Sequence, residues 1–169
     1  MLTVVVVMLL SCTAEGELSE QTWNCGESGN NVTATLRGNT FLTISGTGAM
    51  ANYFFLNDIP WWDSRDAIKT VKIENGVTSI GRNAFYDCSN LISMTIPNSV
   101  TAIGNSALTA CNNLVEINVN ADNTTFCSVD GVVYSKDKTT LLIFPGADFG
   151  DTRPPISVIP VHSTVFSFL

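Results

Sequence analysis

The chain has 169 residues, of which 45% are hydrophobic and 14% charged, so it is long enough and apolar enough to bury a sizeable core. This composition excludes an intrinsically disordered protein. The formal net charge is −7, and only eight residues are Lys or Arg, too few to form the basic surface that nucleic-acid binding needs. We therefore expect no nucleic-acid partner.

The N-terminal residues 1–12 are predicted to be an export signal. Leu2–Leu10 is an almost unbroken apolar run, too short to span a bilayer as a mature helix but suited to a signal peptide, although a basic region before it is missing. The run ends in Leu9-Leu10-Ser11-Cys12, which resembles the lipobox of bacterial lipoproteins. We expect lipidation of Cys12, and membrane contact only through that lipid; the alternative is simple cleavage after a small residue such as Ala14.

Residues 13–22 are mostly polar and are expected to be a flexible lead-in, with order beginning near Trp23. Residues 23–67 are predicted to form an N-terminal cap. Two alternating runs, Val32–Leu36 and Phe41–Ile44, are joined by turn residues, which predicts a β-hairpin. The aromatic-rich stretch 49–63 then covers the first coil of a repeat array in our interpretation; an exposed aromatic platform for a ligand is the alternative.

A 23-residue stretch occurs twice in succession, at 71–93 and 94–116, with 10 of 23 positions identical. The identical positions include Ile73 and Ile96, Gly81 and Gly104, and Cys88 and Cys111. A fixed period that keeps apolar and glycine positions indicates stacked coils. Residues 23 apart should therefore lie directly above one another.

Each coil is predicted to begin with a strand, at residues 68–73, 91–96 and 114–119, in an L-x-x-L-x-L skeleton. Gly81 and Gly104 are expected to let the backbone bend toward the convex side. There, residues 84–88 and 107–111 are expected to form short helical or 3-10 turns.

The third coil differs from the first two. Residues 126–134 and 140–144 flank a charged turn at 135–139, which predicts a hairpin in place of the convex segment. The repeat array would thus cover residues 68–145, followed at 146–169 by a degenerate or truncated final coil. The expected fold is a β-rich leucine-rich-repeat solenoid with short convex turns or 3-10 segments, an N-terminal β-hairpin and aromatic cap, and a hairpin-bearing terminal repeat.

These motifs resemble the BspA-like leucine-rich repeats of microbial surface proteins, whose unit is I-P-x-S-V-T-x-I-G-x-x-A-F-x-x-C-x-x-L. Ile96–Leu114 matches this unit with Leu108 in place of Phe, and Val77–Leu91 matches its second part. Leu42–Met50 with Pro60-Trp61, and Ser128–Leu141, are similar to the family's cap and hairpin-bearing repeat. The resemblance implies a cell-surface or secreted protein that binds a protein ligand, such as a host matrix protein or a microbial surface protein.

Catalytic, cofactor and metal sites are not expected. The single histidine, His162, lies in the C-terminal tail, so a Ser-His-Asp or Cys-His arrangement would have to be built there. The pairs Asp63/Asp66 and Asp58/Asp63 are interpreted as solvated loop residues rather than glycosidase carboxylates. A weak calcium site between coils stays open as an alternative. Cys88 and Cys111 are interpreted as small buried apolar side chains, and Asn31 and Asn123 begin glycosylation sequons.

The candidate binding residues are the outward-facing positions of the repeat strands, which should line the concave face. They are Thr70, Lys72, Glu74, Ser93, Thr95, Glu116, Asn118 and Asn120. Three strands would make this face about 10–15 Å wide, enough for a peptide or loop. The alternative is a structural or spacer module that assembles through the open C-terminal edge of the repeat array.

Overall fold

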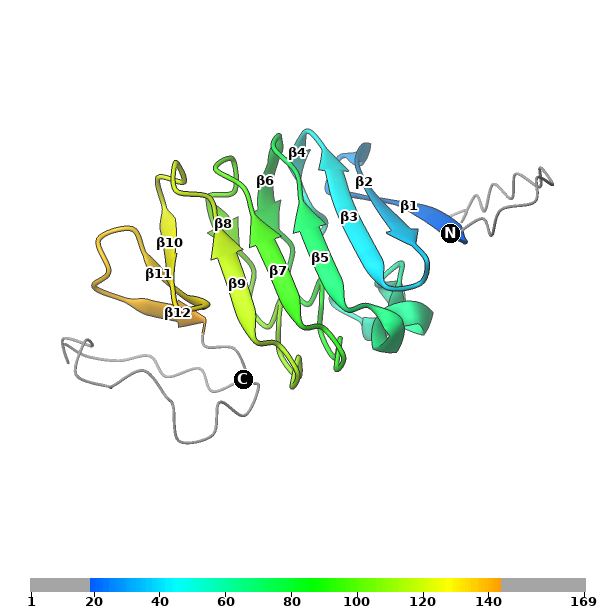
Figure 1. The fold of residues 1–169 in the computed structure, drawn as a ribbon. Helices are drawn as coiled ribbons and strands as arrows, with labels where there is room; N and C mark the ends of the chain where they lie inside the picture. Colours follow the sequence, from blue (N-terminus) through cyan, green and yellow to red (C-terminus); the bar gives the residue numbers. More distant parts are fainter. Residues whose placement is uncertain (1–18, 144–169) are drawn as a thin grey trace, which may run out of the picture.

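The computed structural model describes residues 19–143 and is built mainly of β-strands (Figure 1). Its largest sheet has six strands in the order β1-β2-β3-β5-β7-β9. These strands are β1 (Glu20–Gly26), β2 (Gly29–Arg37), β3 (Phe41–Gly46), β5 (Thr70–Ile73), β7 (Ser93–Ile96) and β9 (Glu116–Val119). The first three strands are antiparallel, and β3, β5, β7 and β9 are parallel.

The repeat strands are stacked in the register that the sequence period predicts. Thr70 pairs with Ser93, and Ser93 pairs with Glu116, a shift of 23 residues at each step. Ile73 and Ile96 are 1% and 0% exposed. The prediction that residues 23 apart lie above one another is therefore confirmed.

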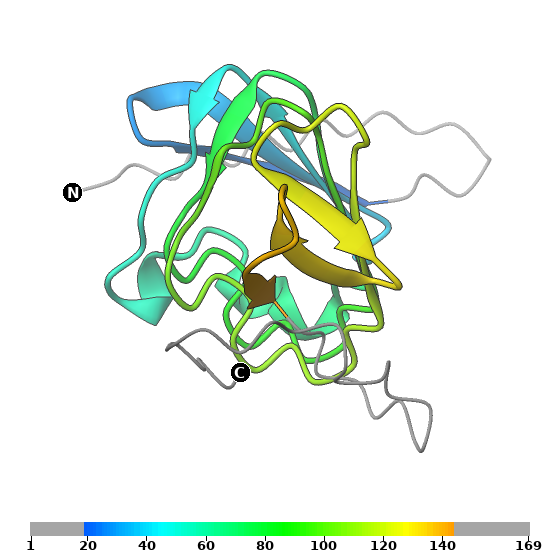
Figure 2. The ribbon, with the colours of Figure 1, turned by 90° about the vertical axis from the view of Figure 1, so that its left-hand side faces the viewer.

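A second parallel sheet forms another side of the coils. It consists of β4 (Gly48–Ala49), β6 (Val77–Ile80) and β8 (Ala102–Ile103), in that order. Figure 2 shows successive coils overlying one another in a view along the stack. Apart from Val132, the buried apolar side chains belong to one cluster, of which Trp61 and Phe85 are the largest fully buried members. Alternation in the strands directs the aliphatic side chains into this cluster and the polar ones outward.

The convex segments at 84–88 and 107–111 are turns, so the expected helical or 3-10 conformation is wrong there. The chain adopts left-handed φ angles at Asn83 (56°) and Asp87 (57°), which interrupts any helix. Amide groups between the turns instead bond to the next coil, as in Phe85 N–H to the Ala107 carbonyl at 2.8 Å. Hydrogen bonds between coils therefore alternate with local bonds such as Tyr86 N–H to the Asn83 carbonyl at 3.1 Å, where a helix would have local bonds alone.

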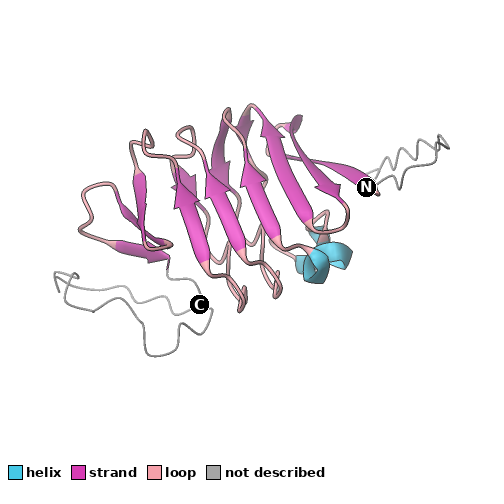
Figure 3. Ribbon diagram, in the orientation of Figure 1, coloured by secondary structure: helices cyan, strands magenta, loops and turns pink. Residues whose placement is uncertain are grey.

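Two 3-10 helices do occur, in the range expected to be a cap: η1 (Leu56–Asp58) and η2 (Trp62–Ala67), shown as helices in Figure 3. This range also contains β3, which pairs in parallel with β5. The register shift from β3 to β5 is 29 residues, so this first coil is six residues longer than the next. The parallel array therefore begins at β3, within residues 23–67. Order also begins before Trp23, because β1 starts at Glu20.

The role of Gly81 and Gly104 differs from the expected one. Neither has a positive φ angle, so neither is needed for an unusual bend. A Cβ atom on Gly81 would collide with the carbonyl oxygen of Ala51, and one on Gly104 with the backbone nitrogen of Arg82. These positions are glycine because the preceding coil occupies the space of a side chain.

The chain after β9 forms a three-stranded antiparallel sheet of β10 (Phe126–Val129), β11 (Val132–Ser135) and β12 (Leu141–Ile143). The run 126–134, expected to be one strand, is split by Asp130 and Gly131, whose φ angles are 51° and 80°. Two successive left-handed residues make the tight turn of a hairpin, and Asp-Gly is a preferred sequence for it.

Within residues 19–143, no helix is long and apolar enough to cross a bilayer. The expected export signal with Cys12, the lead-in before Ser19, and the segment 146–169 with His162 lie outside the described residues.

Candidate binding face

The eight predicted binding residues lie along neighbouring strands of the six-stranded sheet. Thr70, Ser93 and Glu116 occupy one row across β5, β7 and β9, and Lys72, Thr95 and Asn118 occupy the next. Glu74 and Asn120 follow the ends of β5 and β9. Since alternate residues of a strand share one face, all these side chains belong to the polar face of the sheet.

Five of the eight residues line one shallow groove, largely open to solvent, where β5, β7 and β9 end. These are Lys72, Glu74, Thr95, Asn118 and Asn120. The row Thr70, Ser93 and Glu116 lies outside the groove lining, toward the beginnings of the strands. The structure therefore brings together the predicted residues near the carboxyl ends of the strands and separates the others from them.

Opposite charges flank one side of this groove. The Lys72 Nζ atom is 3.4 Å from Glu74 Oε1, and the two side chains are 52% and 44% exposed. An ion pair this exposed contributes little stability, on the order of 0–1 kcal/mol. Both groups can therefore exchange this contact for a ligand's charges at small cost.

The backbone of the groove carries a gap in the sheet's hydrogen bonds. Asn120 N–H donates to the Ile96 carbonyl at 2.9 Å, and one coil earlier the corresponding pair is Pro97 and Ile73. Pro97 has no N–H group and cannot make this bond. Both Ile73 and Pro97 line the groove, so the Ile73 carbonyl is an acceptor without its ladder partner there.

The polar face is wider than the three repeat strands. Thr22, Thr35 and Thr43 continue the row of Lys72 across β1, β2 and β3. Six strands span about 24 Å, against 10–15 Å for three. The alternation of Thr33, Thr35, Thr43 and Ser45 with apolar residues was visible in the sequence, but nothing in it joined this hairpin to the repeat strands.

The aromatic stretch serves mainly as core, with two exceptions. Trp61 and Tyr53 are 1% and 6% exposed, and the Trp61 ring stacks on Phe85 at 5.7 Å between centroids. Phe54 and Phe55, in the longer first coil, are 71% and 74% exposed. An aromatic platform as a whole is therefore absent, although these two rings face solvent.

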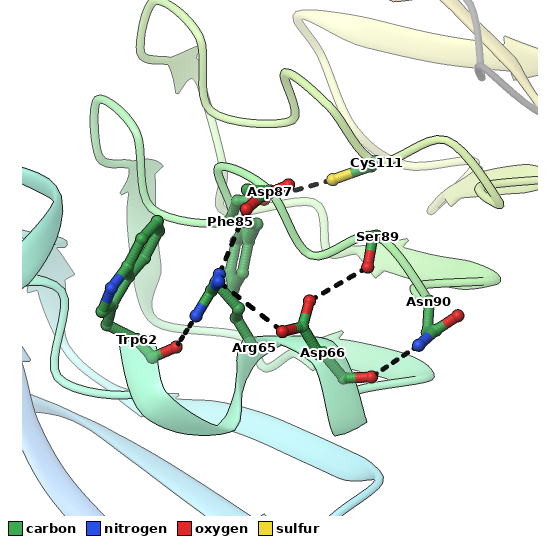
Figure 4. Close-up of polar contacts among 8 residues, drawn as sticks. All are labelled: Trp62, Arg65, Asp66, Phe85, Asp87, Ser89, Asn90 and Cys111. Atoms are coloured by element: carbon green, nitrogen blue, oxygen red, sulfur yellow. Dashed lines mark hydrogen bonds and ion pairs between the residues drawn. The ribbon is translucent and has the colours of Figure 1, made fainter.

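Polar contacts fasten η2 of the first coil to the turn residues of the second (Figure 4). The Arg65 side chain donates to the Trp62 carbonyl at 2.8 Å, lies 3.2 Å from Asp87 Oδ2 and covers the Trp62 ring at 3.9 Å. Asp66 accepts a hydrogen bond from Ser89 Oγ at 3.0 Å. These contacts hold the coils in register, and with them the strands that carry the groove.

The described cysteines are free, and Cys25, Cys88 and Cys111 are buried. Burial raises the pKa of Cys25 and of Cys111 to about 12, and it raises the pKa of Cys88 as well. Such thiols are unreactive near neutral pH because the thiolate is the nucleophile. These three cysteines therefore act as small core residues.

Other chemistry finds little support in the part of the chain that the structure describes. No cluster of three His, Cys, Asp or Glu side chains there could hold a metal ion. Asn123, the first residue of a sequon, is 0% exposed, so its side-chain nitrogen is inaccessible to modification in the fold. Asn31 begins the other sequon, and its Nδ2 atom, the atom that glycosylation would modify, donates to the Thr47 carbonyl at 2.7 Å.

The C-terminal edge of the sheet is covered, which removes the feature that supported assembly through it. Ile117 N–H donates to the Gly131 carbonyl at 3.0 Å, and Val119 N–H donates to Ser128 Oγ at 3.0 Å. The β10–β11 hairpin therefore occupies the amide groups through which β9 would pair with another strand.

Comparison with known proteins gives a family match and three similar structures. Residues 63–130 match the family model for the BspA type leucine rich repeat region (6 copies). No curated protein matches the sequence. A leucine-rich repeat protein from Eubacterium ventriosum is 24% identical, with 75% of this chain and 51% of that chain covered and a TM-score of 0.43.

The pneumococcal vaccine antigen PcpA is 25% identical, with 46% of this chain and 25% of that chain covered and a TM-score of 0.37. A leucine rich cell surface protein from Faecalibacterium prausnitzii is 14% identical, with 68% and 60% covered and a TM-score of 0.24. The chain thus spans about half, a quarter and three fifths of the lengths of these structures.

Proposed function

Because the chain belongs to the BspA-type leucine-rich repeat family, we propose that it is an exported binding module that holds a protein ligand on the polar face of its sheet. The stacked coils would form a short solenoid, with β1 and β2 as its N-terminal cap and the β10–β12 sheet as its terminal repeat. The role is binding rather than catalysis, since the face offers hydrogen bonds and charges but no activated nucleophile.

The observation that carries this proposal is the groove at the ends of β5, β7 and β9. It combines the charges of Lys72 and Glu74 with the side chains of Thr95, Asn118 and Asn120. The threonine hydroxyl and the two asparagine amides can each donate and accept hydrogen bonds. The Ile73 carbonyl adds an acceptor suited to a backbone N–H. An extended peptide segment or exposed loop supplies all of these complementary groups, and it fits a groove three strands wide.

The affinity of this face should be moderate. The groove has no aromatic side chain in its lining, and strong protein interfaces are usually anchored by Trp, Tyr or Arg. Hydrogen bonds that replace water contribute only about 0.5–1.5 kcal/mol each. We therefore expect micromolar binding at a single site.

The proposal is tested by binding of the full chain to immobilised host matrix proteins and to microbial surface proteins, measured by biolayer interferometry. Lys72→Glu reverses the charge beside the groove and should weaken binding about tenfold, with Asn118→Lys causing a similar loss by filling the groove. Lys138→Glu makes the same charge change in the exposed turn before β12 and serves as the matched control.

Binding that Lys72→Glu and Lys138→Glu weaken equally would indicate a general charge effect, and binding that neither Lys72→Glu nor Asn118→Lys alters would place the ligand elsewhere. Either result would refute the groove as the ligand site. Circular dichroism and thermal melting of each variant ensure that a loss of binding does not reflect unfolding.

A further inference from the structure

The two outer strands of the six-stranded sheet differ in how their backbones are covered. At β9, the outward amide groups of Ile117 and Val119 already donate to Gly131 and Ser128. At the other end, β2 is the one strand within residues 19–143 with which β1 pairs. An uncovered edge strand is a template for pairing with another chain.

The hydrogen bonds of β1 show which of its backbone groups face outward. Gly38 N–H donates to the Ser19 carbonyl at 2.9 Å, so Ser19 and Gly38 form a hydrogen-bonded pair in the register in which Thr22 faces Thr35. Such pairs alternate along an antiparallel ladder. The N–H and C=O groups of Glu20, Thr22 and Asn24 therefore point away from β2, and no partner for them exists among residues 19–143.

The open part of this edge is short and has a definite end. After Asn24 the register of β1 shifts, and the chain around β4 covers the edge. There, Ala51 N–H donates to the Cys25 carbonyl at 2.8 Å, and Glu27 N–H donates to the Ala49 carbonyl at 2.9 Å. Considering residues 19–143, the uncovered stretch is therefore 20–24.

This stretch contains no lysine, proline or inward-pointing charge, three of the features that prevent strands from pairing at an edge. Its one charged residue, Glu20, lies 2.9 Å from Arg37 of the neighbouring strand. Trp23 points to the opposite side from Glu20 and contacts the Trp61 ring edge-on at 6.4 Å, but it remains partly exposed. An added strand would cover it further.

We propose that the partner of this edge is a second copy of the chain, paired antiparallel through residues 20–24 and centred on Thr22. In this register Thr22 faces Thr22 of the second copy, Glu20 faces Asn24, and Gln21 faces Trp23. Every outward N–H and C=O group of Glu20, Thr22 and Asn24 gains a partner, and no two like charges are opposed.

The dimer would be a symmetric extension of the sheet. A two-fold axis through an antiparallel strand pair runs perpendicular to the sheet, so the polar faces of both copies lie on one side. The two grooves could then bind a repetitive ligand together, which strengthens attachment without new contacts. One strand pair buries less surface than a stable interface, so dimerisation should occur at roughly 0.1–1 mM.

The test uses sedimentation velocity of the full chain, in a mild detergent that keeps the apolar stretch Leu2–Leu10 dispersed, over a range of concentrations up to about 1 mM. Thr22→Lys places two like charges directly opposite each other and should weaken dimerisation about tenfold or more, and Thr22→Glu should do the same. An equimolar mixture of the two variants should restore the dimer, because opposite charges then meet across the axis.

Thr22 is exposed, so these substitutions should leave the fold intact, which thermal melting verifies. Thr95→Lys makes the same charge change in the same row of the sheet, on β7, and should leave dimerisation unaltered while it disturbs the groove. The inference is independent of the ligand face, because Thr22 does not line the groove and Thr95 does.

A chain that remains monomeric at the highest concentration would overturn the proposal. Dimers that survive Thr22→Lys would overturn it as well, by placing the contact on another surface, for example the exposed Phe54 and Phe55. If each charged variant were monomeric and their mixture failed to dimerise, the pairing centred on Thr22 would be refuted.

Discussion

Asn123 closes the last coil with a single buried side chain. It lies one repeat length after Val100, at a position where the earlier coils have valine. Its Nδ2 group donates to the carbonyls of Pro97 and Val100, both at 2.8 Å. Its Oδ1 atom accepts from the amide groups of Thr125 and Phe126 at 2.9 and 2.8 Å. The amide thus satisfies four backbone groups where the chain leaves the repeat.

Replacing Asn123 with Asp tests this role with almost no change of shape. A carboxylate can still accept both hydrogen bonds, but it cannot donate, and it brings negative charge against two buried carbonyl oxygens. We expect the free energy of unfolding to fall by about 3 kcal/mol or more, measured by urea denaturation. Asn112→Asp, at an exposed position, should change it by less than about 0.5 kcal/mol.

The buried thiols predict how stability depends on pH. Burial raises the pKa of Cys25 and of Cys111 from 9.0 to about 12, so the folded state holds these protons more tightly than the unfolded state does. Their contribution is complete below about pH 9 and is lost as the pH rises toward 12. We expect the unfolding free energy to fall by about 1.4 kcal/mol per pH unit for each thiol in this interval.

Urea denaturation between pH 7 and 11 measures this slope. Cys25→Ala removes one thiol and should reduce the slope by about 1.4 kcal/mol per pH unit. Identical slopes for the wild-type protein and Cys25→Ala would contradict a buried thiol with a raised pKa at this position.

At the scale of elements, contact between coils depends on close approach of their backbones. A Cβ atom added to Gly81 would collide with the carbonyl group of Ala51 and would lie 3.5 Å from the backbone nitrogen of Asn52. Gly81→Ala would therefore push the first two coils apart. We expect a loss of about 2–4 kcal/mol in unfolding free energy, seen in chemical denaturation.

Gly29→Ala is the matched control, because no atom lies within 4 Å of its added Cβ although its φ angle is +89°. Conformational strain alone should cost this variant about 1–2 kcal/mol. A smaller loss for Gly81→Ala than for Gly29→Ala would show that the coils can separate without penalty.

The elements also show where sequence patterns suffice. Identical residues at Ile73 and Ile96, and at Cys88 and Cys111, predicted the register of β5, β7 and their turns, because stacked coils repeat the same environment. The Asp130-Gly131 pair after β10 is also a sequence signal for a tight turn, although the run 126–134 was expected to be a single strand. By contrast, the left-handed conformations of the convex turns were only weakly indicated: Asn83 and Asp87 are residue types that favour this region, but Ser106 and Ala110, which adopt it at the same positions of the next coil, are not.

At the scale of the whole molecule, the described fold starts at Ser19, seven residues after the proposed lipidation site. If Cys12 is lipidated, cells that carry the lipoprotein pathway should incorporate labelled palmitate into the chain and retain it in the membrane fraction. Cys12→Ala should abolish the label and release the protein. An unlabelled wild-type chain, with its N-terminus after Ala14, would instead support simple cleavage.

At this scale, part of the candidate site could be predicted from the sequence and part could not. The outward residues of β5, β7 and β9 were identified from alternation, since side chains of a strand face opposite sides in turn. The sequence did not show that some of these residues line the groove and others lie outside it. That division depends on where the strands end and on Pro97, which interrupts the hydrogen-bond ladder. The contribution of β1, β2 and β3 to the same face was missed for a similar reason.

The sequence by itself determined the stacked architecture, its 23-residue step and the identity of the buried aliphatic positions. These follow from local periodicity, which a chain displays residue by residue. Only the tertiary structure decided that the N-terminal hairpin joins the repeat sheet, that the β10–β11 turn covers one edge of it, and that no other strand of the described residues covers residues 20–24 at the other edge. Pairing between distant strands depends on backbone hydrogen bonds, which any residue except proline can make, so amino-acid identity records them poorly.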